Sequence, residues 1–170
     1  MDRIRIAIVF DTKEDYGINT ADLNYCDFSY LSDVEYMKEQ LEYEGYEVIL
    51  TNPPDKFFEI VKGTNYKALF DVVFNISEGF KSRNREILVP IVCETLQIPY
   101  IGSDAFGLSF SNHKFHTKLF AKHLGVNTPD YFYFDYRIHT FQSLRDFFET
   151  NSLFYIALQH NANYVVTLFL

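Results

Sequence analysis

The chain has 170 residues, of which 48 % are hydrophobic and 18 % aromatic, enough for one domain or for one domain and part of a second. Its 15 basic and 23 acidic residues give a net charge of −8, which argues against nucleic-acid binding as the main activity. The charged amino terminus leads directly into an apolar run, and no stretch of about 18 apolar residues occurs. We therefore expect neither a signal peptide nor a membrane span.

The sequence contains two cysteines, Cys26 and Cys93, which lie far apart and belong to no CxxC motif. This spacing argues against a disulfide framework and against a zinc site. We interpret both as buried, reduced thiols of a cytoplasmic protein.

The first part of the chain alternates between strand and helix patterns. An apolar run at residues 4–10 predicts a strand that is buried on both faces, and residues 48–50 predict a second strand. Between them, a helix is indicated by apolar residues at helical spacing: Tyr30, Val34, Met37 and Leu41. Ser32 and Glu35 can form a capping box for this helix, and Gly45 stands where it would end. Residues 57–61 predict a short helix.

The alternation continues through the middle of the chain and loosens after Gly125. A third strand is predicted at residues 71–75, an amphipathic helix at 87–96 and a brief strand at 98–102. Asn112 can cap the next helix, which carries Phe115, Leu119 and Leu124. A strand at 131–134 and a helix at 140–148 follow.

These patterns predict an α/β fold with a parallel, Rossmann-like sheet and helices on both faces. Ligands of such sheets bind beyond the carboxyl ends of the strands. The loops after Phe10, Asn75 and Ile101 are therefore the candidate binding loops.

Charged residues collect in the loop after the third strand: Glu78, Arg83, Arg85 and Glu86. An arginine fork can hold a carboxylate in a bidentate manner, and a structural ion-pair network explains the same residues equally well. Gly79 allows a backbone conformation that other residues resist. The amides of Gly102 and Ser103 could face a ligand, or the pair could form a turn with a serine cap.

Several motifs in fixed order carry a resemblance to a known family. Val73-Phe74-Asn75 precedes a loop with Glu78-Gly79, and the segment Gln97-Ile98-Pro99-Tyr100-Ile101-Gly102-Ser103 resembles "GIPYxGS". Lys114 and Lys118, followed by Gly125-Val126-Asn127-Thr128-Pro129, resemble "DKxxxK…GxPTP". This ordered set is similar to the D-alanine–D-alanine ligases, which are ATP-grasp enzymes, and the match covers about three-quarters of the chain.

The resemblance implies a pre-ATP-grasp domain at residues 1–125 and the start of an ATP-grasp subdomain at 126–170. Such ligases phosphorylate a carboxylate with ATP and magnesium, and an amine then attacks the acyl phosphate. By resemblance, Glu14, Glu78 and Arg85 are candidate contacts to an amino-acid substrate, and Lys118 is a candidate contact to the nucleotide phosphates. A solvated loop carboxylate at Glu14 and a solvated lysine face on the helix are the alternative interpretations.

The family pattern breaks at several positions. His113 stands where the family has an aspartate, and we interpret it and the other helix histidines as surface residues without a metal site. Leu158-Gln159 stands where a Lys-Pro pair is expected, and no glycine follows Gly125. Residues 151–170 lack charged side chains and end in an apolar, β-prone segment. The magnesium ligands of the family are absent, so we expect a truncated or frameshifted product.

The first hypothesis is the amino-terminal part of an ATP-dependent ligase that is inactive alone and carries no catalytic residue of its own. An amino acid is the implied substrate, and a homodimer, without nucleic-acid or membrane partners, is the implied assembly. The alternative is a non-catalytic α/β binding or subunit-interaction protein. A flavodoxin-like or receiver-type domain with Asp11 after the first strand is a third, weaker alternative, because no second acidic residue stands beside Asp11.

Overall fold

The computed structural model of the protein describes residues 3–22, 26–63, 65–82, 84–129, 131–133, 139–151, 157–158 and 165–167. The chain forms two compact units, Met1–Leu108 and Ser109–Leu170. The boundary predicted from the sequence lies instead at residues 125/126, and that division into domains stays a prediction.

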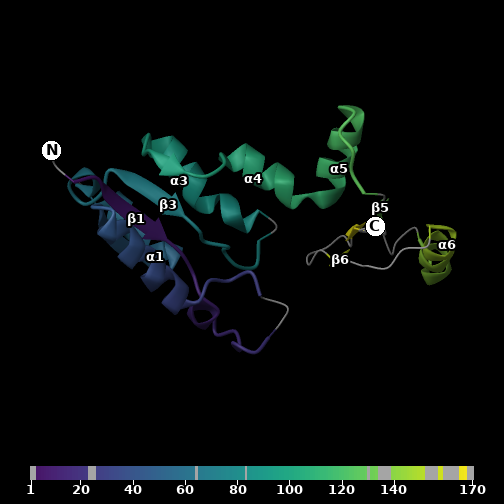
Figure 1. Cartoon of the computed structure of the whole chain (residues 1–170), viewed down its shortest axis with the longest axis horizontal. Coiled ribbons are helices and arrows are strands. Elements are labelled where there is room, and N and C mark those ends of the chain that lie inside the picture. The colour runs from purple at the N-terminus through teal and green to yellow at the C-terminus, as the bar shows by residue number, and fades with distance from the viewer. Residues whose placement is uncertain are drawn as a thin grey trace. The chain divides into compact units, whose positions relative to one another are not determined.

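The first unit is built on a four-stranded parallel sheet (Figure 1). Its strands are β1 (Arg5–Val9), β2 (Glu47–Thr51), β3 (Val72–Asn75) and β4 (Tyr100–Ile101), in the order β2-β1-β3-β4. In the register of β1 and β3, Val9 lies beside Asn75, so the two strands end at the same level. The four strands predicted in this part of the chain are therefore confirmed, and the loops after β1 and β3 begin next to each other.

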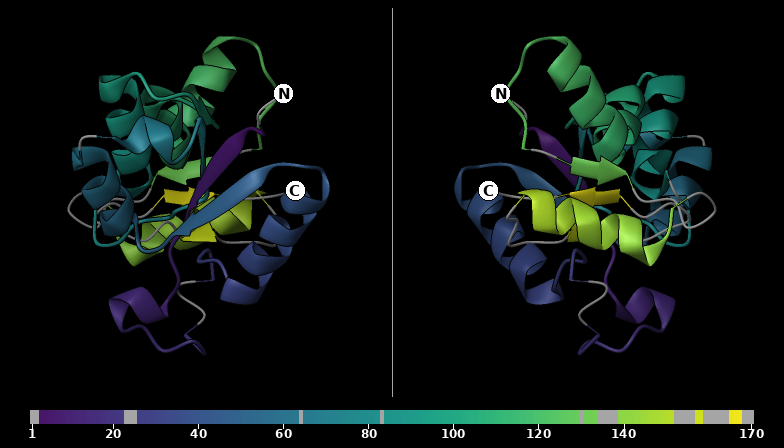
Figure 2. Two further views of the ribbon diagram at one scale, coloured as in Figure 1. Left: turned by 90° about the vertical axis from the view of Figure 1, so that its left-hand side faces the viewer. Right: turned by 90° about the vertical axis from the view of Figure 1, so that its right-hand side faces the viewer.

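Helices cover both faces of this sheet, as the sequence predicted (Figure 2). The helix α1 (Leu31–Tyr43) lies on one face, where its Val34 packs against Ile6 and Ile8 of β1. The helices α2 (Pro54–Lys62) and α3 (Leu88–Leu96) contribute to the opposite face. Alternate residues of β1 point to opposite sides of the sheet, which is why one short strand supplies both cores.

The core of the second face is formed by Ala7 and Val9 of β1 together with Phe57 of α2 and Val89 of α3. All four side chains are buried, with at most 1 % of their surface exposed. The apolar run from Ile6 to Val9 in β1 therefore fits a sheet covered on both sides.

Both predicted helix caps are wrong. Tyr30 is the N-cap of α1, and the Ser32 hydroxyl lies 3.4 Å from Asp33 instead of capping the helix. Asn112 ends the helix α4 (Ala105–Asn112), which the apolar spacing did not single out. The next helix, α5 (Lys114–His123), begins after His113 and has no side-chain cap.

The second unit contains α5, the helix α6 (Phe141–Asn151) and a three-stranded antiparallel sheet. Its strands are β5 (Tyr131–Tyr133), β6 (Ala157–Leu158) and β7 (Val165–Thr167). The apolar segment at the end of the sequence does form a strand, β7, which pairs with β5 on one side and β6 on the other. Both edges of β7 are thus hydrogen bonded. Gln159 lies outside the described residues.

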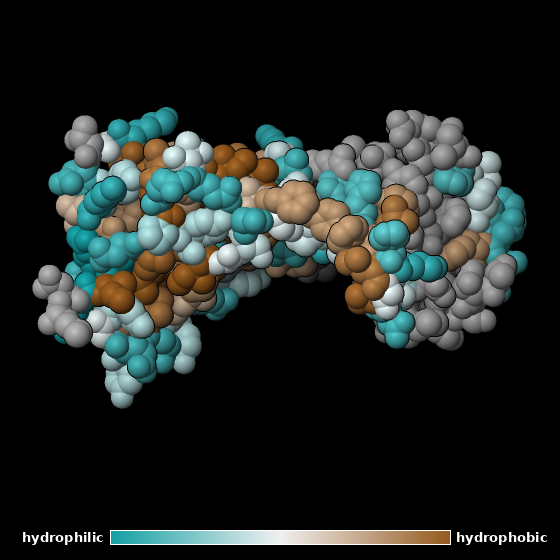
Figure 3. Space-filling model, turned by 90° about the horizontal axis from the view of Figure 1, so that it is seen from above, coloured by the Kyte–Doolittle hydropathy of each residue, from teal (hydrophilic) through white to brown (hydrophobic). Residues whose placement is uncertain are grey.

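Some apolar side chains remain at the surface of the first unit (Figure 3). The outer side of α3 exposes Leu88, Ile91 and Leu96. Cys93 of the same helix is buried, and burial raises the pKa of its thiol to about 12, as expected for an unreactive core thiol. Cys26 is exposed, so the prediction of a second buried thiol is wrong.

Among the described helices, none combines the length and the apolarity that crossing a membrane would need.

Candidate functional site at the carboxyl edge of the parallel sheet

Asp11 joins the loops that follow β1 and β3. Its side chain is fully buried, and its Oδ1 accepts a hydrogen bond of 2.9 Å from the backbone N–H of Glu78. Its Oδ2 accepts hydrogen bonds from the N–H of Gly79 at 2.7 Å and from the hydroxyl of Tyr16 at 2.9 Å. Such bonds offset the cost of removing a carboxylate from water. Asp11 is therefore a structural bridge, which argues against the receiver-type alternative.

Gly79 occupies a position that only glycine fits without strain. Its φ of 69° lies in the left-handed region, in agreement with the sequence-based expectation. A Cβ atom added at this position would lie 2.7 Å from the carbonyl oxygen of Arg85 and 2.9 Å from its Cβ. The close approach of these two segments brings Arg85 to the edge of the sheet.

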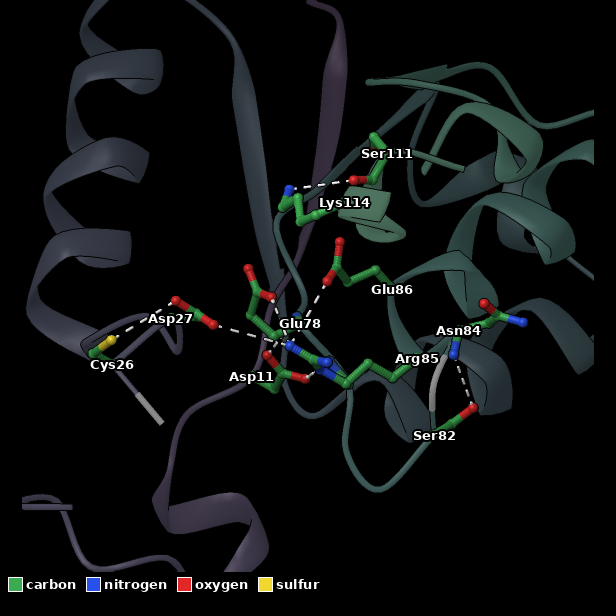
Figure 4. A network of polar contacts seen from close by, with 11 residues as sticks. Asp11, Cys26, Asp27, Glu78, Ser82, Asn84, Arg85, Glu86, Ser111 and Lys114 are labelled. Carbon is green, nitrogen blue, oxygen red and sulfur yellow. Dashed lines mark hydrogen bonds and ion pairs between the residues drawn. The ribbon is translucent and has the colours of Figure 1, made fainter. Parts of the chain in front are cut away.

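Arg85 faces three carboxylates, as the close view in Figure 4 shows. Its Nη2 lies 3.7 Å from Glu78 Oε2, 3.7 Å from Glu86 Oε1 and 4.0 Å from Asp27 Oδ2. We call Asp27, Glu78, Arg85 and Glu86 the Arg85 cluster. The structure thus brings together two of the predicted site residues, Glu78 and Arg85, in an ion-pair network.

The electrostatics of the Arg85 cluster are dominated by burial and by negative charge. Burial is the main cause that raises the pKa of Glu78 to about 7, and the charges of Glu86, Asp27 and Asp11 add to it. Arg85 acts in the opposite direction but does not outweigh them. The cluster therefore favours a cationic group over an additional carboxylate.

The loop after β1 is fixed by further polar contacts. The buried Lys13 donates from its Nζ to the carbonyl oxygens of Thr20 at 2.9 Å and Asp22 at 2.7 Å. Asp15 Oδ2 accepts from the N–H of Thr12 at 2.7 Å and from Asn52 Nδ2 at 2.5 Å. These hydrogen bonds link the loop to itself and to Asn52, which follows β2.

Glu14 lies in this loop, within the short 3-10 helix η1 (Glu14–Tyr16), and it is exposed. The two site residues Glu78 and Arg85 meet each other, whereas Glu14 is not among their ion-pair partners in the described residues. Its predicted contact to a substrate stays a prediction. Arg83 lies outside the described residues.

Aromatic rings link the two loops beside the charged groups. The ring of Tyr16 stacks on Phe80 with centroids 4.8 Å apart and contacts Phe28 at 5.5 Å. Burial is the main cause that raises the pKa of the Tyr16 hydroxyl, and the charge of Asp11 and its hydrogen bond with this hydroxyl add to the effect. Sequence analysis missed Tyr16, because its contacts depend on how the loops after β1 and β3 fold together.

The start of α4 is capped by carboxylates. Asp104 Oδ1 accepts a bond of 2.6 Å from the N–H of Gly107, and Glu94 Oε1 accepts one of 2.9 Å from the N–H of Ala105. Glu94 also accepts a bond of 2.9 Å from the Tyr100 hydroxyl. The residue that caps α4 is therefore Asp104 and not Ser103. The amides of Ala105 and Gly107 already have carboxylate acceptors.

Lys118 lies in the second unit, on α5. Its Nζ donates to the Thr128 hydroxyl at 3.1 Å and to the carbonyl oxygen of Pro129 at 3.2 Å. These bonds tie the helix to the segment that precedes β5. The Nζ of Lys114 donates to the carbonyl oxygen of Ser111 at 3.2 Å. No acidic residue occurs at positions 105–129, so this stretch is locally cationic.

A metal site is not evident in the described part of the chain, where His, Cys, Asp and Glu side chains form no group of three or more that could hold an ion.

The fold is similar to that of the amino-terminal part of solved D-alanine–D-alanine ligases. The ligase from Bacillus anthracis matches 96 % of this chain with a TM-score of 0.58 and 17 % identity. Its complex with ATP matches 98 % of the chain with a TM-score of 0.60 and 17 % identity. The ligase from Aeromonas hydrophila matches 96 % with a TM-score of 0.55 and 12 % identity.

At these identities, the similarity shows the fold. The chain spans about half the length of the solved structures, which is 49 % of the two Bacillus anthracis chains and 56 % of the Aeromonas hydrophila chain. No protein-family model matches the sequence, and no curated protein does.

Proposed function

We propose that the chain is the amino-terminal part of an ATP-dependent carboxylate–amine ligase of the D-alanine–D-alanine ligase type. The observation that carries this proposal is the fold match, which extends over 96–98 % of the chain and includes both compact units. Polar side chains also collect at the carboxyl edge of the parallel sheet, where α/β proteins bind their ligands.

In this proposed function, the role of the first unit is to bind an amino-acid substrate. The ammonium group of an amino acid suits the acidic edge formed by Glu78 and Glu86, with Glu14 as a further contact. Arg85 orients these carboxylates. Holding the substrate in a fixed position lowers the entropic part of the barrier for the reaction of the whole ligase.

ATP is the proposed cofactor, because one of the solved neighbours is a complex with ATP. Bound ATP would supply the phosphoryl group that activates a carboxylate. Lys118 is the residue of this chain that would contact its phosphates, and the cationic stretch around it fits that role. The described residues do not offer a magnesium site, so no step through magnesium is assigned to them. A cytoplasmic location and a homodimer belong to the same proposal.

The test measures amino-acid binding by the 170-residue chain. NMR chemical shifts are recorded during titration with D-alanine and, separately, with L-alanine. We expect D-alanine to shift resonances of the loops after β1 and β3, because these loops form the acidic edge. Glu78→Gln should weaken the binding, whereas Glu59→Gln on the exposed side of α2 should leave it unchanged.

Phosphate release from ATP, with and without D-alanine, completes the test. We expect none above background from this chain. Release that depends on D-alanine would contradict the inactive-part proposal, and a folded chain that binds no amino acid would contradict the substrate assignment.

A further inference from the structure

Lys13 is a buried lysine in the loop that follows β1. The residue exposes only 5 % of its surface. Removing an ammonium group from water is unfavourable unless hydrogen bonds compensate it. The Lys13 Nζ donates to the carbonyl oxygen of Thr20 at 2.9 Å and to that of Asp22 at 2.7 Å. These two bonds offset part of the cost of burying the charge.

The backbone of Lys13 belongs to the same arrangement. Its carbonyl oxygen accepts hydrogen bonds from the N–H of Tyr16 at 3.2 Å and from the N–H of Ile18 at 3.0 Å. Together with the two side-chain bonds, alternate residues of the loop, at positions 16, 18, 20 and 22, are hydrogen bonded to Lys13. The segment after η1 therefore folds around one residue, and the bonds to positions 20 and 22 are the ones that need a lysine side chain.

Hydrophobic packing does not explain why this loop holds a buried charge. Among the described residues, the two hydrophobic cores of the first unit include no side chain from positions 11–22. A surface segment with few buried apolar contacts opens locally at low cost. Burying a charge is also a poor way to gain stability. The buried lysine therefore points to a need for one defined loop conformation.

Glu14 is the residue whose backbone this arrangement surrounds. Lys13 precedes it, and the two residues that follow it are also bonded through their side chains. Asp15 accepts hydrogen bonds with its Oδ2, and the Tyr16 hydroxyl donates to the buried Asp11 at 2.9 Å. Glu14 itself is exposed and contributes no side chain to these bonds. An exposed carboxylate on a restrained backbone can bind a ligand with little further loss of conformational entropy.

We propose that Lys13 is a positioning residue, whose buried ammonium group restrains the loop after β1 so that Glu14 can contact the ammonium group of an amino-acid substrate. This inference rests on the proposed function, because it uses the contact of Glu14 with that substrate. Lys13 does not touch the substrate, since its Nζ donates to carbonyl oxygens of its own loop. It acts through the backbone that carries Glu14.

The first test is hydrogen–deuterium exchange of the whole chain, followed residue by residue by NMR. In the parent chain we expect the amides of Ile18 and Asp22 to be protected from exchange. Lys13→Met keeps the length of the side chain but removes the ammonium group, and it should lower this protection by roughly tenfold. The amides of β1 should exchange as before. The matched control Lys62→Met, at an exposed position on α2, should behave like the parent chain.

The second test is the affinity for D-alanine, measured by NMR titration of Glu14→Gln, Lys13→Met and the double variant. Glu14→Gln should raise the Kd roughly tenfold in the parent chain but less than about twofold in Lys13→Met, because a loosened loop no longer places the carboxylate. A role of Lys13 in stability alone would not couple the two substitutions in this way.

Three outcomes would overturn the positioning role. Exchange of the Ile18 and Asp22 amides at the intrinsic rate in the parent chain would do so without any variant, so the test does not depend on the folding of Lys13→Met. If the parent chain binds D-alanine and the losses from Lys13→Met and Glu14→Gln multiply, the positioning role fails while the proposed function stands. If the folded parent chain binds no D-alanine, both fail.

Discussion

The two ends of the parallel sheet each carry an arginine, and the two arginines are used differently. At the amino end, the described carboxylate that Arg5 meets is that of Asp71: the Arg5 Nε lies 3.0 Å from Asp71 Oδ2 and its Nη2 lies 2.6 Å from Asp71 Oδ1. The same guanidinium donates to the carbonyl oxygens of Lys67, at 3.0 Å, and Ala68. At the carboxyl end, Arg85 faces three carboxylates at 3.7–4.0 Å.

The titration of the two ends differs accordingly. Hydrogen bonds from Arg5 are the main cause that lowers the pKa of Asp71 to about 2. Burial and neighbouring carboxylates raise the pKa of Glu78 to about 7. At the amino end, Arg5 thus pairs with the carboxylate of Asp71. At the carboxyl end, three carboxylates share Arg85, and their excess negative charge can be stabilised by a cation or a proton.

The largest expected effect comes from Gly79→Ala at the carboxyl end. The alanine Cβ would meet the carbonyl oxygen of Arg85 at 2.7 Å, and the φ of 69° is unfavourable for alanine. We expect the free energy of unfolding to fall by about 2–5 kcal/mol, from backbone strain together with overpacking. Urea denaturation followed by circular dichroism measures this change.

Gly17→Ala is the matched control, because Gly17 has a φ of 66° and nothing within 4 Å of an added Cβ. It should lower the free energy of unfolding by only about 1–2 kcal/mol, the cost of the backbone conformation alone. Equal losses in the two variants would show that the approach of Arg85 to Gly79 does not restrain the loop.

Asp11→Asn should have the next largest effect, because it removes an acceptor from the buried bridge. An amide NH2 would face either the N–H of Glu78 or the pair formed by the N–H of Gly79 and the Tyr16 hydroxyl. Leaving buried donors unpaired costs about 1–3 kcal/mol. Asp15→Asn is the control, since Asp15 also accepts several hydrogen bonds but is exposed. The melting temperatures of both variants are measured by thermal unfolding. Equal decreases would show that the burial of Asp11 does not determine the size of the effect.

The fold could be predicted from the sequence because its signals are local. Apolar runs such as residues 4–10 and 71–75 became β1 and β3, and Gly45 does end α1, with a φ of 96°. The cap predictions failed because the backbone conformation before a helix decides which residue caps it. Tyr30 has an extended conformation, with φ −88° and ψ 140°, and directly precedes Leu31, the first residue of α1. The serine that fits a capping box is therefore already inside the helix.

The candidate site was predictable only in part. Glu78 and Arg85 are close in the sequence and follow one strand, so their meeting could be expected. The bridge from Asp11 to the amides of Glu78 and Gly79 joins residues 67 and 68 positions apart. Such a pairing depends on the register of β1 and β3, which no local pattern specifies.

Glu78→Gln tests how stability depends on pH at the carboxyl end of the sheet. The raised pKa means that the folded chain binds a proton more tightly than the unfolded chain does, so stability falls as pH rises from about 4.5 to about 7. The variant should lack this loss and exceed the parent chain at pH 8 by on the order of 1–2 kcal/mol. Urea midpoints between pH 5 and pH 8 measure it. Parallel pH profiles for the two proteins would mean that Glu78 is already ionised at pH 5.

The smallest effect is expected at the amino end, with the opposite sign. The pKa of Asp71 is lowered from 3.8 to about 2, so the stability from its pair with Arg5 is present above about pH 4 and is lost as pH falls towards 2. The effect is small because Asp71 exposes 43 % of its side chain to screening by solvent. Arg5→Gln and Asp71→Asn should each flatten the stability profile below pH 4, and the double variant should be no flatter than either. If the two substitutions changed the stability profile additively, the two side chains would act separately, and the ion pair of Arg5 with Asp71 would contribute nothing to stability at this end of the sheet.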